Sequence, residues 1–265
     1  MADEIKTRAS NRGLSALFLA RDVVLNALPL PQRPHILLAC MPKSGSTFLA
    51  TALSELPALR RCRLTPALGE REQELCHVRL SLYNHRGYVA QHHIRNSAWT
   101  QHLIAKYHLT PVVLVRNLAD CVISSRDHLR HAPESSPMYA FVPEHMKMSD
   151  AELEEVIVRM ALPWYINFYM GWRQDKNALF VDYNDLAGDP AKVIESVLAQ
   201  TGMSFTRKDV DKALSRCKKR DTRFNVGGSG RGRDLSPSAA KALAQLLDLY
   251  PSMKDDRLFI ESRYK

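Results

Sequence analysis

HILLAC (His35–Cys40) and MPKSGSTF (Met41–Phe48) follow one another in the first fifth of the chain, and together they decide its fold. The first segment is a nearly continuous apolar run, which is typical of a buried parallel strand. The second is made of small and polar residues, and a helical pattern follows from about Thr47 to Leu56. A strand, a short loop and a helix in this order bring backbone N–H groups and the positive end of a helix dipole to one point. The stretch therefore predicts an α/β fold with an anion-binding loop.

The side chains of this loop add to its attraction for an anion. Gly45 permits close approach of a ligand, and Lys43 supplies positive charge. Hydroxyl donors come from Ser44, Ser46 and Thr47. The kinase-type loop GxxxxGK[ST] has its lysine after the last glycine, whereas Lys43 precedes Gly45 here. The alternative interpretation is a plain strand–turn–helix with a solvent-exposed lysine.

Three further segments predict strands of the same sheet: Tyr88–Ile94, Pro111–Val115 and Ala178–Tyr183. Because helical patterns alternate with these strands, we expect a three-layer α/β fold, in which a central, mainly parallel sheet carries helices on both faces. A single domain over residues 1–265 accounts for the pattern, with a helical N-terminal extension at residues 1–34.

Helix-start signals support this arrangement. Asp189-Pro190 and Ser236-Pro237 each combine an N-cap residue with proline at the first helical position. Ser149 and Glu152 have the spacing of a capping box, which predicts the start of a long helix reaching about Trp172.

The composition suits a folded protein with an anionic ligand. The 265 residues are 45% hydrophobic and carry a net charge of +9, which favours nucleotides, nucleic acid or acidic membrane surfaces without choosing among them. The five cysteines are widely spaced and form no CxxC pair, which argues against a zinc site and fits a reducing compartment. Leu14–Leu30 is interrupted by Arg21 and Asp22, so it reads as an amphipathic helix. We expect a cytoplasmic protein without stable membrane insertion.

The segment Pro42–Phe48 resembles the PKSGTTW loop of the sulfotransferases that use 3′-phosphoadenosine-5′-phosphosulfate (PAPS). In that family the loop holds the 5′-phosphosulfate end of the donor, and the resemblance implies the same role for Lys43 to Phe48. Ser46 stands where the family has threonine. Phe48 stands where it has a tryptophan associated with the adenine, so an aromatic face is kept.

A second resemblance follows the strand Pro111–Val115. The family has an arginine at a strand end and a serine eight positions later, and both contact the 3′-phosphate of the donor. Arg116 and Ser124 keep that spacing, and a guanidinium fork suits a phosphate group. The alternative role for Arg116 is an ion pair with Asp120.

Two further segments resemble the family less closely. Tyr183 matches the tyrosine of a strand-end YEDL segment that lies near the adenine, although it also suits a core position. The stretch Asn225–Gly230 keeps the glycines of the RKGxxG loop, and so implies that Gly227 and Gly230 bind the donor. The Arg-Lys pair of that loop is missing, and Arg231 is the residue that we expect to replace its charge.

A histidine suits the removal of a proton from an acceptor hydroxyl, because its pKa lies near neutrality. Side chains alternate along a strand, so His92 shares its face with Ala90 and Ile94, and His93 shares its face with Gln91. The family places its catalytic histidine here, in KTHL-like sequences, and this resemblance selects His93. The alternative is a hydrogen-bonded structural histidine.

The resemblance implies in-line transfer of a sulfuryl group from PAPS to an acceptor hydroxyl, with His93 as the base and Lys43 stabilising charge on the leaving phosphate. No metal-ligand spacing is present, so we expect no metal cofactor. Small molecules, lipids and carbohydrates all offer suitable hydroxyl groups, and an amine acceptor fits equally well. Two other functions stay open on the residues alone: a nucleotide or small-molecule kinase with a degenerate loop, and a nonenzymatic basic module. The second of these would bind nucleic acid, which we do not expect here, because the reading motifs of that class are missing.

The segment 131–148 combines several prolines with apolar residues that include Tyr139 and Phe141. Apolar side chains on a long irregular segment beside a reaction centre predict a lid that contacts the acceptor and excludes water. The alternative is an ordinary packed surface loop.

Overall fold

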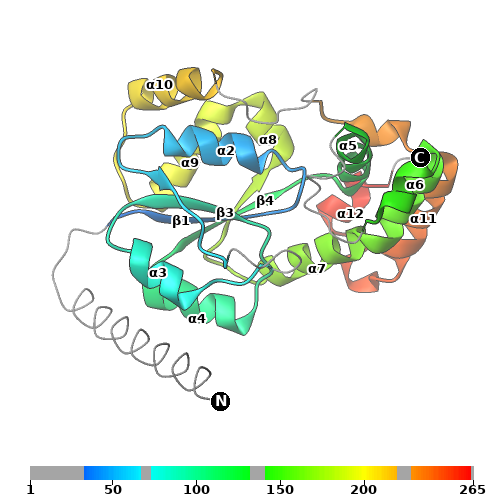
Figure 1. Ribbon diagram of the computed structural model, residues 1–265, viewed down its shortest axis with the longest axis horizontal. Helices are drawn as coiled ribbons and strands as arrows, with labels where there is room; N and C mark the ends of the chain where they lie inside the picture. The colour runs from blue at the N-terminus through cyan, green and yellow to red at the C-terminus, as the bar shows by residue number, and fades with distance from the viewer. Residues whose placement is uncertain (1–32, 67–72, 132–140, 220–227, 264–265) are drawn as a thin grey trace, which may run out of the picture.

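A five-stranded sheet forms the centre of the fold, with its strands in the order β2-β3-β1-β4-β5 (Figure 1). The strands are β1 (His35–Cys40), β2 (Arg60–Arg61), β3 (Tyr88–His92), β4 (Thr110–Val115) and β5 (Leu179–Asp182). Every pairing between them is parallel. The computed structural model describes residues 33–66, 73–131, 141–219 and 228–263.

The position of β1 places the predicted anion-binding loop at a switch in strand order. β1 lies in the middle of the sheet, and it pairs with β3 on one side and with β4 on the other. The register sets Ala39 beside His92 and Cys40 beside Leu114, so all three strands end at the same edge. Ligands of open parallel sheets bind in the crevice outside this edge, at the point where the strand order reverses.

Alternation along β1 divides the core between the two faces of the sheet. Ile36, Leu38 and Cys40 belong to one apolar cluster, and Leu37 and Ala39 belong to a larger one on the opposite face. The smaller cluster packs against α2 (Ser46–Ser54), α9 (Pro190–Gln200) and α10 (Arg207–Cys217), which lie together on one side of the sheet in Figure 1. The larger cluster takes in α3 (His77–Tyr83), α4 (Ala98–Tyr107), α5 (Leu118–His131), α6 (Asp150–Met160), α7 (Leu162–Trp172), α11 (Pro237–Asp248) and α12 (Arg257–Glu261).

The three-layer arrangement and the predicted helix starts are confirmed. The side chains of Ser149, Asp189 and Ser236 each accept a hydrogen bond from a backbone N–H in the first turn of α6, α9 and α11, respectively. These caps satisfy N–H groups that the helices themselves leave without partners.

One prediction about the elements is wrong, and one element was not predicted. The long helix expected from Ser149 to Trp172 is two helices, because α6 ends at Met160 and α7 begins at Leu162. Pro163, at the second position of α7, has no N–H to continue the helical ladder. The two-residue strand β2 was not predicted, since a pair of exposed arginines carries no strand pattern.

Candidate active site at the carboxyl edge of the sheet

The loop after β1 has the backbone shape of an anion cradle. Lys43 and Gly45 both have left-handed backbone angles, with φ of 65° and 80°. A left-handed conformation costs about 1–2 kcal/mol in a residue with a side chain, so its presence at Lys43 requires compensating contacts. One such contact is inside the loop, where the Ser44 hydroxyl donates to the Met41 carbonyl oxygen at 2.6 Å.

Helix α2 starts from this loop without a side-chain cap. Gly45 is its N-cap residue, and glycine has no side chain that could accept from the first-turn N–H groups. A bare helix N-terminus at the centre of a parallel sheet is a suitable site for a phosphate or sulfate group. A Cβ at Gly45 would lie 3.2 Å from the ring of Tyr183, and the φ of Gly45 already favours glycine.

Arg116 joins this loop to a second one. Its guanidinium lies just past β4, is nearly buried, and donates to the carbonyl oxygens of Lys43 and Gly228, each at 2.9 Å. The guanidinium also lies 4.0 Å from the centre of the Tyr183 ring, and 3.7 Å from a carboxylate oxygen of Asp120. The contact with Lys43 is one that holds the left-handed loop in place. The ion pair with Asp120, which was the alternative role for Arg116, is present as well.

Asp120 organises the second loop from the first turn of α5. Its two carboxylate oxygens accept from the backbone N–H groups of Gly230 and Gly232, at 2.9 and 2.7 Å. Gly230 has a φ of 78°, so its backbone needs the freedom of glycine. Gly227, the other predicted glycine, lies outside the described residues. The sequence pattern indicates Asp120 only as an ion-pair partner of Arg116 and carries no signal of its part in shaping the loop.

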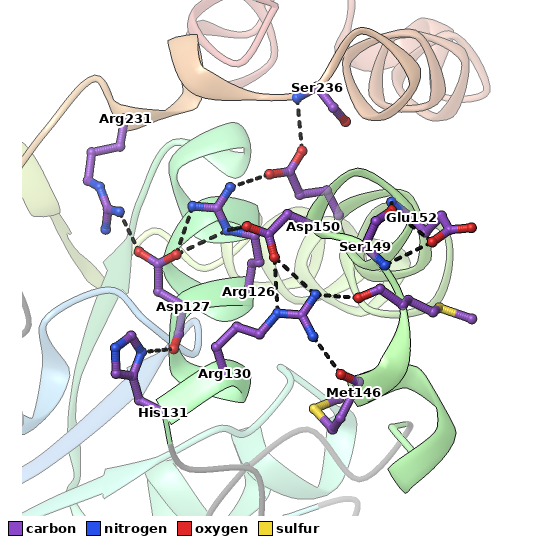
Figure 2. A network of polar contacts seen from close by, with 12 residues as sticks. Arg126, Asp127, Arg130, His131, Met146, Ser149, Asp150, Glu152, Arg231 and Ser236 are labelled. Atoms are coloured by element: carbon purple, nitrogen blue, oxygen red, sulfur yellow. Dashed lines mark hydrogen bonds and ion pairs between the residues drawn. The ribbon is translucent and has the colours of Figure 1, made fainter.

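Arg231 forms an ion pair with Asp127 of α5. This contact is part of a network of charged side chains along α5 and α6 (Figure 2). In the network the Arg126 guanidinium lies between the carboxylates of Asp127 and Glu154. Glu154 is buried, and it also accepts from the backbone N–H of Ser236 at 2.8 Å. The network therefore fixes the second loop and α11 against the helix that carries Ser124, which is itself buried.

Arg130 extends the network to the segment predicted as a lid. Its guanidinium donates to the carbonyl oxygens of Met146 and Met148 at 2.7 and 2.6 Å, and it pairs with Asp150 (Figure 2). Residues Pro143–Lys147 form a short 3-10 helix, and Phe141 packs against the larger core cluster. Residues 132–140, including Tyr139, lie outside the described residues.

The two adjacent histidines have different surroundings. His92 is buried, and its Nε2 accepts from the Leu64 N–H at 2.9 Å while its Nδ1 lies 3.3 Å from the Gln73 side-chain oxygen. Burial lowers the pKa of His92 to about 3, so its ring stays neutral. These contacts are structural, in agreement with the face assigned from the sequence.

His93 lies just past β3 and is only half-buried. Its Nδ1 is 2.9 Å from the Cys40 carbonyl oxygen, and its backbone N–H donates to the Gln73 side chain at 2.8 Å. A carbonyl oxygen can only accept, so the proton of the neutral ring sits on Nδ1, and Nε2 carries the lone pair. Burial disfavours the charged ring, but interactions with Cys40 outweigh this effect and raise the pKa of His93.

Gln73 and Gln91 are site-forming residues that the sequence did not reveal. Gln91 lies on β3 two residues before His93, and its side chain reaches the hydroxyl groups of Ser46 and Thr47. Phe48 is partly buried against the smaller core cluster. Alternation along the strand could have pointed to Gln91, but no local pattern points to Gln73.

Within the described ranges, no group of His, Cys, Asp or Glu side chains is arranged to hold a metal ion. A search of the same residues finds no helix with the length and apolar character needed to span a membrane.

Comparisons with solved structures support the fold. Mouse sulfotransferase SULT7A1 complexed with PAP superposes with a TM-score of 0.64 at 16% sequence identity, over 88% of this chain and 89% of that chain. Retinol dehydratase in complex with androsterone and PAP gives a TM-score of 0.57 at 14% identity, over 91% and 86% of the two chains. Sulfotransferase STF1 from Mycobacterium tuberculosis gives 0.51 at 12% identity, over 82% and 78%.

No curated protein matches the chain in a sequence search. The sequence profile of the sulfotransferase domain matches residues 33–226, which include the loop after β1, both adjacent histidines, and the Arg116–Ser124 segment. With this match and the sheet, loops and histidine described above, the chain belongs to the sulfotransferase domain family, a family of enzymes.

Proposed function

We propose that this enzyme transfers a sulfuryl group from PAPS to the hydroxyl group of an acceptor. The observation that carries the proposal is the bridge made by Arg116. A single buried guanidinium holds the cradle at Lys43 and the loop at Gly228 together beside the bare N-terminus of α2. A donor with one anionic group at its 5′ end and another at its 3′ position needs two such anion sites, side by side.

The residues present fit such a donor. The loop Lys43–Thr47 would hold the 5′-phosphosulfate, through backbone N–H groups and hydroxyl groups at the start of α2. Arg116 and Ser124 would hold the 3′-phosphate. The Nε of Arg116 is buried and has no hydrogen-bond partner among the described residues, as expected of a donor group reserved for an anion. The mouse sulfotransferase and retinol dehydratase structures that superpose on this chain both contain PAP.

Three further residues would complete the donor site in different ways: Tyr183, Gly230 and Arg231. Tyr183 supports the loop, because its ring packs against both Gly45 and Arg116. Gly230 shapes the second loop through its bond to Asp120. Arg231 would contact the donor only after exchanging its ion pair with Asp127 for a phosphate. Phe48 and Gly227 keep the adenine and loop roles that the family resemblance implies.

His93 would act as the general base. The Cys40 carbonyl keeps the proton on Nδ1, and Nε2 is then the atom that takes the proton of the acceptor hydroxyl. As that proton leaves, a bond forms between the acceptor oxygen and sulfur, and the bond from sulfur to the 5′-phosphate oxygen breaks. Lys43 and the N–H groups of α2 would stabilise the charge that develops on the leaving phosphate, where each preorganised donor is worth a few kcal/mol.

Calorimetry tests the donor assignment. We expect 3′-phosphoadenosine 5′-phosphate to bind without magnesium, and more tightly than ATP with magnesium or than duplex DNA. A preference for ATP with magnesium would instead support a kinase, and a preference for DNA would support a nucleic-acid-binding module.

A transfer assay with sulfur-labelled PAPS tests the reaction and identifies the acceptor class. The panel should contain small-molecule alcohols and phenols, carbohydrates, hydroxylated lipids and matched amines. Label should appear in a hydroxyl compound and depend on His93. Label that appears only in amines would contradict the proposed hydroxyl acceptor, and binding of PAPS without transfer to any compound would contradict the reaction itself.

A further inference from the structure

A hydrogen-bond chain reaches the donor cradle from the opposite side of β3. Arg61, on the edge strand β2, donates to the Gln91 side-chain oxygen at 2.6 Å. The Gln91 amide nitrogen then donates to the hydroxyl oxygen of Ser46 at 2.8 Å, and lies 3.4 Å from that of Thr47. The chain therefore crosses from the edge of the sheet to the first turn of α2.

The chemistry of the three groups fixes the direction of this chain. A guanidinium can only donate, so Gln91 must turn its oxygen toward Arg61 and its amide nitrogen toward the loop. The amide nitrogen can only donate in its turn, so it occupies a lone pair of the Ser46 oxygen. The proton of Ser46 is then directed away from Gln91. Ser46 is nearly buried at the start of α2, where the proposed anion site lies.

A second arm ties the same arginine to α2 itself. The other terminal nitrogen of Arg61 lies 3.4 Å from the Thr51 hydroxyl oxygen, and that hydroxyl donates to the Thr47 carbonyl at 2.7 Å. The fork of Arg61 thus spans β3 and α2, and holds Gln91 in one orientation.

We propose that Gln91 is a positioning residue of the transfer reaction, oriented by Arg61, and that it sets the Ser46 hydroxyl as a donor to the anionic end of PAPS. The inference rests on the proposed function for the identity of the anion. Gln91 itself touches the loop hydroxyls, and its effect on the donor passes through Ser46.

Two substitutions of Gln91 separate this role from a merely structural one. Gln91→Met removes the amide and should weaken the binding of 3′-phosphoadenosine 5′-phosphate about 10-fold, the scale of one hydrogen bond to a charged group. Gln91→Glu keeps the shape but reverses the direction, because a carboxylate accepts the Ser46 proton. It should weaken binding further than Gln91→Met. The melting temperature of the Gln91→Glu variant should not fall below that of the wild type, because the new carboxylate pairs with Arg61.

A double-mutant cycle shows whether Gln91 acts through Ser46. In a Ser46→Ala background, Gln91→Met should cost less than about 2-fold in affinity. Gln101→Met is the matched control, because Gln101 also bridges two side chains, Asn96 and Asp175, but lies outside the loop. That control should bind the nucleotide like the wild type.

Calorimetry with the full chain decides between the outcomes. Wild-type affinity in both Gln91 variants, or the same loss with and without the Ser46 hydroxyl, would overturn the inference. If the wild-type protein does not bind the adenosine bisphosphate, the proposed donor is wrong, and the same cycle is measured with inorganic pyrophosphate as the anion. Equal pyrophosphate binding by all variants would then refute the positioning role independently.

Discussion

Arg116→Lys should separate the charge of this residue from its geometry. The substitution keeps a cation beside Asp120 and the Tyr183 ring, but it replaces a planar fork with a compact ammonium. In the wild type, Arg116 donates to two carbonyl oxygens, those of Lys43 and Gly228, each at 2.9 Å. The N–H groups of a lysine ammonium share one nitrogen, whereas Arg116 serves the two carbonyls from two separate nitrogens. We therefore expect lysine to lose one of the two contacts, and with it the tie between the loops.

The expected cost follows from that lost contact. A hydrogen bond from a charged donor contributes about 1.5–3 kcal/mol, and Arg116 is almost fully buried, so solvent screening reduces this little. The free energy of unfolding should therefore fall by about 1.5–3 kcal/mol. Affinity for 3′-phosphoadenosine 5′-phosphate should fall at least about 10-fold, and more than affinity for adenosine 5′-phosphate, which lacks the 3′-phosphate.

Urea denaturation and calorimetry measure the two effects. The denaturation slopes must agree between variants for the stability comparison to hold. Arg159→Lys is the matched control, because Arg159 forms an exposed ion pair with Glu155 on α6 and should change stability by less than about 0.5 kcal/mol. The reasoning is refuted if Arg116→Lys matches the wild type in stability, or if both nucleotides lose affinity equally.

Three further results are expected. His93→Gln should lower turnover at least about 100-fold with donor affinity retained, and wild-type turnover should decline as pH falls through the raised pKa of His93, as steady-state pH profiles will show. The folded state keeps His92 neutral down to about pH 3, whereas the unfolded chain protonates it below about pH 6.5. The stability advantage of the wild type over His92→Gln should therefore shrink as the pH falls from about 6.5 to about 3, as denaturant titrations will show. Arg130→Met should speed hydrogen exchange at residues 143–148, because the carbonyls of Met146 and Met148 lose their partner; unchanged exchange there would show that Phe141 packing holds the segment.

The donor side of the proposed site has a clear signal in the sequence because its parts are contiguous. The loop Lys43–Thr47 contains its own glycine, hydroxyls and helix start, and each of these follows from a local requirement of the backbone. The family resemblance selects Arg116 and His93, and in the structure each directly follows a strand, at the edge where the ends of parallel strands meet. The sheet order, in which β1 lies between β3 and β4, places these residues at the same edge of the sheet.

The residues that were missed act across long distances in the chain. Gln73 lies 20 positions before His93, and Asp120 holds N–H groups more than 100 positions away. A buried carboxylate that accepts two backbone N–H groups has no periodicity or spacing in the sequence, because its partners are fixed only when the whole sheet has formed. The split between α6 and α7 has a local signal in Pro163, but the apolar pattern on both sides of it favoured one long helix.

The same contrast between local and long-range signals explains why the sequence indicates a class of donor but no acceptor. Anionic donors are commonly bound by the same few groups, which include N–H donors at a helix start, guanidinium groups and small residues that permit close approach. An acceptor hydroxyl requires only a base, which His93 can supply, and a surface that fits the rest of the molecule. That surface has no fixed chemistry. We expect the segment that follows α5 to contribute to it, and Arg130 couples the end of this segment to the helix that carries Ser124. We therefore expect specificity for the acceptor to depend on segments whose sequences are not constrained by the transfer chemistry.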